Sequence, residues 1–178
     1  IIIFNDVGRQ LFTTILQKNL MSTQKEREEE LVKGDAIIKL ASGGNKDAAK
    51  YLHMIGRVWR VLDDIHDGDH PVSRSDLLEI ISYLLIRIPS NSFYMQHYAQ
   101  LNSQHVTAYN AWKASNRWIN GTLEQKVFSH VWRGDYQAVI GLVALLTQGV
   151  DKMMLVDKKV KETFGPVGED FDINKLGE

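Results

Sequence analysis

The chain has 178 residues, of which 44% are hydrophobic, and its 21 Lys or Arg and 22 Asp or Glu leave a net charge of −1. Such a balance gives no bulk attraction to nucleic acid or to an anionic membrane, so we expect neither as a partner. The absence of cysteine excludes disulfides, a thiolate nucleophile and a cysteine zinc site. It also fits a reducing compartment, and we expect a cytoplasmic protein.

Two predicted helices open the chain. Residues 6–20 place their apolar side chains on one helical face, and Thr23 with Glu26 predicts a capping box for a second helix that runs to about residue 41. Met21 reads like a natural start, so we treat residues 1–22 as an N-terminal helical extension. Residues 23–164 form the predicted bundle domain, and the acidic residues 165–178 form a predicted flexible tail.

The clearest predicted helix begins at Asn45, a favourable N-cap. It ends between Gly68 and Pro71, because proline cannot continue a helix. Apolar side chains recur along it at alternating spacings of four and three residues, which is typical of a helix with one buried face. The residues of this buried face are Ala48, Leu52, Ile55, Trp59 and Leu62.

A dense group of acids and histidines closes this helix. We take five of them as candidate metal ligands, namely Asp63, Asp67, Asp69, His66 and His70. Each carboxylate near the negative C-terminal end of a helix is disfavoured by about 0.3–1 kcal/mol, so a counter-charge is expected. A divalent cation such as Mg²⁺ would supply it, and so would Arg60, which lies three and four residues before two of the acids. We favour a solvated, salt-bridged helix end.

The run from Asp63 to Asp67, DDIHD, resembles the DDxxD motif of the isoprenoid synthases. Those all-helical enzymes hold Mg²⁺ against a substrate diphosphate with that motif, so the resemblance implies the same role for Asp63 and Asp67. The doublet His66-Asp67 is similar to one in the HD phosphohydrolases. Both resemblances are confined to these few residues, and no second acidic motif follows downstream.

Only helices are predicted in the rest of the chain. Ser73 or Ser75 caps a helix that ends at Pro89, and its apolar residues predict burial on more than one side. A long helix follows over residues 90–120. No Asp, Glu, Lys or Arg occurs from position 88 to 112. This predicts a face covered by a neighbouring helix or by a partner chain, with a ligand groove as the alternative. His105, on its apolar side, is predicted to be a hydrogen-bonded core histidine.

Thr122 and Gln125 form a second predicted capping box, which starts a short helix. A last helix over residues 136–163 contains the most apolar run of the chain. That run falls far below the roughly 20 residues of a membrane span. The largely buried core residues are predicted to be Trp59, Leu62, Leu84, Leu85, Leu101, Trp112, Leu142, Val143 and Leu146.

These elements predict an all-α fold, a single-domain bundle of about six to seven helices without a sheet. No glycine-rich phosphate loop, nucleophile elbow or HExxH zinc motif occurs. The leading hypothesis is a non-catalytic helical protein that acts through protein contacts, as a homo-oligomer or with another protein. The alternative is a divalent-metal-dependent enzyme that acts on a phosphate or diphosphate ester through Asp63 and Asp67.

Overall fold

The structure, a computed structural model, describes residues 29, 31–68 and 70–164. The chain forms two compact units, residues 1–36 and residues 37–178. In the first unit the described residues are helical, and Leu31 and Val32 are exposed.

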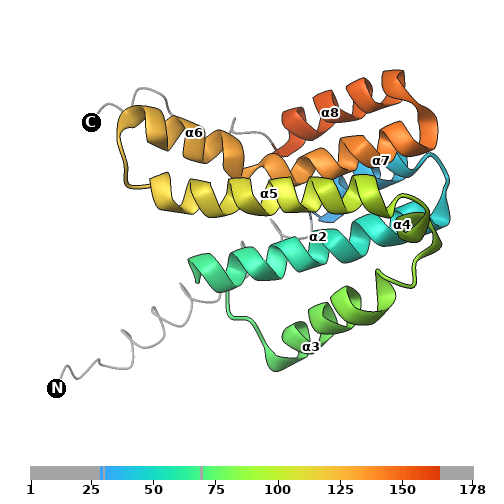
Figure 1. Cartoon of the computed structure of the whole chain (residues 1–178), viewed down its shortest axis with the longest axis horizontal. Coiled ribbons are helices and arrows are strands. Elements are labelled where there is room, and N and C mark those ends of the chain that lie inside the picture. Colours follow the sequence, from blue (N-terminus) through green and yellow to red (C-terminus); the bar gives the residue numbers. More distant parts are fainter. Residues whose placement is uncertain (1–28, 30, 69, 165–178) are drawn as a thin grey trace, which may run out of the picture. The chain divides into compact units, whose positions relative to one another are not determined.

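Every regular element in these described ranges is a helix, which confirms the predicted all-α fold (Figure 1). None of the described helices is long and apolar enough to span a membrane. The predicted helix over 6–20, the Thr23 capping box, the boundary after residue 22 and the tail from 165 lie outside the described residues.

Helix α2, Lys46–Asp67, has the ends that the sequence predicts. The Asn45 side chain accepts hydrogen bonds from the backbone N–H groups of Asp47 and Ala48, both at 3.0 Å. Gly68 closes the helix in the left-handed region, with φ 72°, a conformation that glycine adopts without steric cost. The buried face of α2 packs against α3, α4 and α7, and α2 runs between α3 and α5 in Figure 1.

Helix α3, Arg74–Ser82, continues directly into a π-helical turn, η1, Tyr83–Arg87. The predicted burial of this segment on more than one side is wrong, because only Ile80 and Ile88 are buried. Leu84 and Leu85, placed in the predicted core, are both exposed, Leu85 by 73%. The segment covers one side of α2, and nothing in the described part of the chain covers its outer side.

The π turn explains which isoleucines reach the core. In a regular α-helix, at about 100° per residue, Ile80 and Ile88 would lie about 80° apart around the axis. The Ile88 N–H instead bonds to the Tyr83 carbonyl five residues back, at 2.9 Å. The residue added to that turn rotates the following positions backwards and brings Ile88 nearly into line with Ile80. Ile86 is carried to the outer side, where it is exposed.

The predicted helix over residues 90–120 is two helices, α4, Ser92–Gln96, and α5, Tyr98–Trp118. They are separated at His97, whose φ of −116° and ψ of 24° depart from helical values. Leu101 and Ala108 are buried on the inner side of α5. Helix α6, Leu123–Arg133, starts with the predicted Thr122–Gln125 capping box and packs along α5.

The predicted helix over residues 136–163 is also two helices. After the short 3₁₀ turn η2, Asp135–Gln137, α7, Ala138–Gln148, and α8, Val150–Phe164, form an antiparallel hairpin (Figure 1). Gly149, with φ 92°, breaks them apart. The two helices approach closely at Gly141, where an added Cβ would lie 1.8 Å from Asp157 Oδ1. Val143 is fully buried, as predicted, whereas Leu142 and Leu146 are half-buried.

Candidate functional site

The positive charge beside the predicted acid cluster comes from an arginine on another helix. Arg133, in the last turn of α6, donates two hydrogen bonds to the carboxylate of Asp67, at 2.5 and 2.6 Å. The same guanidinium lies 3.7 Å from Asp63 Oδ1. Only 26% of the Arg133 side chain and 27% of the Asp67 side chain are exposed. Both bonds come from one nitrogen, Nη2, which lies within reach of the two carboxylate oxygens. Hydrogen bonds between charged groups are shorter and stronger than those between neutral groups.

The structure brings some of the five candidate ligands together and separates others. Asp63 and Asp67 lie one turn apart on α2 and share Arg133. Asp63 also accepts a hydrogen bond from the Trp112 indole N–H, at 3.3 Å. The exposed His66 ring lies edge-on to Trp112, with ring centroids 5.0 Å apart.

The two remaining candidates follow the helix. His70 is half-buried, and Asp69 lies outside the described residues. Within residues 29, 31–68 and 70–164, no three His, Asp or Glu side chains are grouped closely enough to hold a metal ion. What the described site holds is two carboxylates around one guanidinium.

No local pattern in the sequence marks Arg133 as the counter-charge. It lies 66 residues after Asp67, whereas a search by helical spacing finds only the nearby Arg60. One signal was present, since Arg133 directly precedes Gly134 and so falls in the last turn of a predicted helix. Basic residues are favoured there by the helix dipole, but that preference does not identify their partner.

Replacing Arg133 with glutamine is expected to lower the free energy of unfolding by about 1–2 kcal/mol. The change leaves two carboxylates at the negative end of α2 without their guanidinium. Arg133→Lys keeps a positive charge on this side chain and should lower the free energy of unfolding by less than Arg133→Gln does. Urea unfolding of the three proteins measures the difference, and equal midpoints would show that Arg133 does not hold this helix end.

Thermal melts of the wild type and of a double variant test whether the acid pair takes up a metal ion. With Arg133 in place, we expect Mg²⁺ or Mn²⁺ to raise the melting temperature no more than NaCl does at equal ionic strength. A larger rise that disappears in the double variant Asp63→Asn, Asp67→Asn would show metal binding to the folded state.

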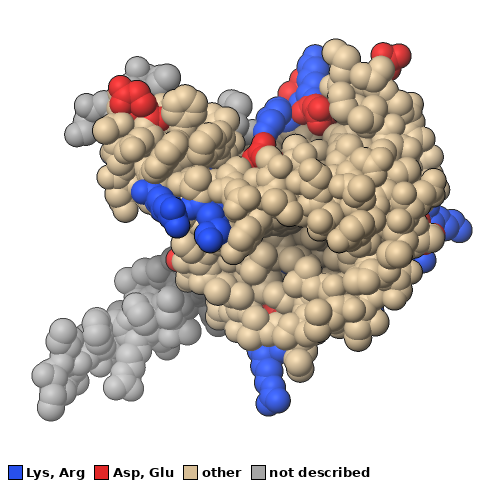
Figure 2. Space-filling model, viewed as in Figure 1, with Lys and Arg blue, Asp and Glu red and all other residues tan. Residues whose placement is uncertain are grey.

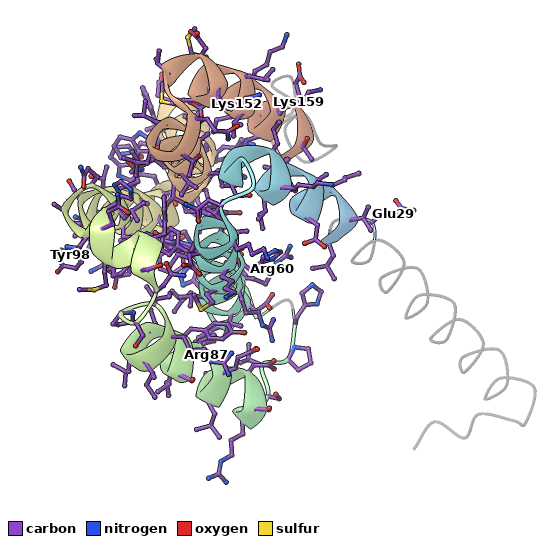
Figure 3. All side chains as sticks on the ribbon, turned by 90° about the vertical axis from the view of Figure 1, so that its right-hand side faces the viewer. Glu29, Arg60, Arg87, Tyr98, Lys152 and Lys159 are labelled. Carbon is purple, nitrogen blue, oxygen red and sulfur yellow. The ribbon has the colours of Figure 1, made fainter. Side chains whose placement is uncertain are left out.

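A second polar cluster lies between α2 and the α3–η1 segment. The Arg57 guanidinium pairs with Asp76, and its Nε lies 3.1 Å from Glu79. The Tyr83 hydroxyl donates to Glu79 at 2.7 Å, and Arg87 stacks 5.5 Å above the Tyr83 ring. The pKa of Asp76 is lowered by hydrogen bonds from Ser73 and by Arg57, and that of Glu79 by the Tyr83 hydroxyl and by Arg57. Figure 3 shows Arg87 on this segment.

The core holds a third polar contact. Tyr51, which is fully buried on α2, has its hydroxyl oxygen 2.5 Å from His105 Nε2 on α5. Burial raises the pKa of Tyr51, so its hydroxyl stays protonated and donates to the imidazole. Burial lowers the pKa of His105 to about 4, which keeps the ring neutral at pH 7. The predicted hydrogen bond of His105 is therefore present, and its half-buried ring lies against the core residue Tyr51.

An exposed apolar surface is the remaining candidate. We call it the apolar stripe, and it lies on the outer side of α3 and η1. At about 100° per residue, Leu77 and Ile81 on α3 lie about 40° apart around the helix axis. The full stripe consists of Leu77, Leu78, Ile81, Leu84, Leu85 and Ile86, all of which are exposed.

The surface of α4 and α5 is also poor in charge, as its sequence predicts. Met95, Tyr98, Val106 and Tyr109 are exposed there, and no charged residue occurs from position 88 to 112. The face shown in Figure 2 is accordingly tan over most of its centre, and the blue Lys and Arg and red Asp and Glu lie mainly toward its edges. Tyr98 stands at the outer side of the helices in Figure 3.

Comparisons with known proteins add no functional assignment. No protein-family model, curated protein or solved structure matches this chain.

Proposed function

We propose that this chain is a non-catalytic helical protein that acts through protein contacts, and that the apolar stripe on α3 and η1 is its contact surface. The exposure of six large aliphatic side chains on one side of one helical segment supports the proposal. Single exposed apolar residues are common, but a continuous group of them on a folded domain is typical of an interaction site.

The size of the stripe supports the same role. Its six side chains together expose about as much surface as three fully solvated residues of their size, on the order of 500 Å² and within the range of the largest patches on monomers. Covering that area would contribute on the order of 10 kcal/mol to the free energy of binding, before the entropic costs of association are subtracted. A contribution of that size can offset those costs when a partner is complementary in shape.

The polar cluster beneath the stripe indicates that the segment is held in a fixed position on α2. Arg57, Asp76, Glu79 and Tyr83 bond to one another on the inner side of the segment. They fix α3 and η1 to α2 through polar contacts, while the aliphatic side chains face outward. The segment therefore keeps its position without using its most apolar side.

The alternative is a divalent-metal-dependent enzyme that acts on a phosphate or diphosphate ester. It rests on the adjacent carboxylates of Asp63 and Asp67, which would have to exchange Arg133 for an ion such as Mg²⁺. We favour the contact role, because Arg133 already supplies the charge that motivates a cation at this helix end.

A photo-activatable phenylalanine analogue placed at Leu78 is expected to cross-link the protein to a partner chain in cells that produce it. Met154, an exposed apolar residue on α8, is the matched control position and should cross-link far less. Adding Leu85→Glu should abolish the cross-link from position 78, because a charge in a covered apolar surface is costly. Equal cross-linking from positions 78 and 154 would contradict the proposal.

A further inference from the structure

We infer that the partner on the apolar stripe is a second copy of this chain, bound stripe to stripe about a two-fold axis. This inference rests on the proposed function and goes further by naming the occupant. Closed two-fold dimers are the most frequent assemblies of soluble proteins, and they place the same surface of each copy against the other.

The charges around the stripe fit a copy of itself. Asp76 and Glu79, the two acids of the segment, are turned toward Arg57 of the same chain. Arg87 lies over the Tyr83 ring, and Arg74 stands at the N-terminal end, before the first residue of the stripe. The stripe itself contains no charged side chain, so a stripe-to-stripe contact places no charge at its centre, whereas a strongly charged partner would find no complementary charge within the stripe.

The area also fits a dimer. A stable interface buries roughly 800 Å² on each partner, and the stripe supplies on the order of 500 Å² of apolar surface. The apolar share would then be near the roughly 65% found in homodimer interfaces. The remaining area would come from the polar residues that border the segment.

The shape of the segment determines which residues meet. The stripe runs along a single helical segment from Leu77 to Ile86, so two copies can pair as two helices with their axes about 8–10 Å apart. Ile81 lies near the middle of the stripe. In a two-fold pairing the central residue of each copy lies near its own counterpart, which places the two Ile81 side chains close to the axis.

Single-cysteine variants test this geometry directly, because the chain contains no cysteine of its own. Ile81→Cys is expected to form a disulfide-linked dimer readily in the purified full chain with a mild oxidant, since a disulfide needs Cβ atoms about 4 Å apart. Met154→Cys, at a position on α8 that is more exposed than Ile81, is the control for random collisions and should form little disulfide-linked dimer. Equal disulfide formation at both positions would overturn the inference.

Sedimentation of the purified proteins gives the second readout. The wild-type chain should sediment as a dimer and Leu85→Glu as a monomer, and Leu85→Ser repeats the test without a new charge. A wild-type dimer that both variants leave intact would overturn the stripe as the interface. A wild-type monomer at every concentration would overturn the second copy as the occupant. The proposed function would survive that last result if position 78 still cross-links to a different protein in cells.

Discussion

Leu101→Ala is expected to lower the free energy of unfolding by about 2–5 kcal/mol, the usual cost of truncating a buried leucine. Leu101 on α5 is fully buried, so the variant loses the transfer free energy of the side chain and leaves a cavity. Leu85→Ala makes the same chemical change at an exposed position on η1 and should alter stability by less than about 0.5 kcal/mol.

Chemical denaturation of the purified proteins measures both values. The Leu85 variant should be compared at low protein concentration, where association does not contribute to the stability of the folded state. A large loss of stability for Leu85→Ala in the monomer would show that the stripe is covered within the chain. The contact surface proposed for α3 and η1 would then not exist.

Acidification from pH 6.5 to pH 4 is expected to destabilise the fold through His105. Its pKa is about 4 in the folded state and near 6.5 when the chain is unfolded. The unfolded state therefore binds more protons across this interval, and stability must fall as the pH falls. At about 1.4 kcal/mol for each pH unit, the largest expected loss is about 3 kcal/mol.

His105→Gln removes the titrating ring and should flatten this part of the stability curve. His66→Gln, which changes an exposed histidine on α2, is the matched control for the substitution itself. Denaturation midpoints measured at several pH values between 4 and 7 give the comparison. Parallel curves for the wild type and the His105 variant would contradict an imidazole that is neutral in the folded state.

Helix ends with strong local signals could be predicted from the sequence. Helix α2 begins after Asn45 and ends at Gly68, as predicted, because an N-cap side chain and a left-handed glycine act on their immediate neighbours. The capping box of Thr122 and Gln125 marks the start of α6 for the same reason. The break at Gly149 was missed, although a glycine after Gln148 is a helix-ending signal. The continuous apolar pattern on both sides concealed it.

The exposure of α3 and η1 could not be predicted from periodicity. Apolar side chains around a helix predict burial within the chain only if enough neighbouring helices exist to cover it. Here α2 covers one side, and the π turn at Tyr83–Arg87 rotates Ile88 inward and Ile86 outward. Hydrophobic spacing contains no information about which apolar face of a helix stays exposed.

The candidate metal site shows a similar limit. The sequence correctly indicated that the acids at the end of α2 need a positive charge. It could not place Arg133 beside Asp67, because that contact depends on how α6 folds back along α5.

The most direct test of the contact role is the protection of the stripe in cells. Leu85→Cys and Met154→Cys each provide a single thiol at an exposed apolar position, and the two positions are exposed by 73% and 65%. In dilute purified protein both thiols should react with a maleimide at similar rates. In intact cells the thiol at position 85 should react several-fold more slowly than the thiol at position 154, because a bound chain covers it. Equal rates in cells would show that the apolar stripe is free of any partner and would contradict the proposed function.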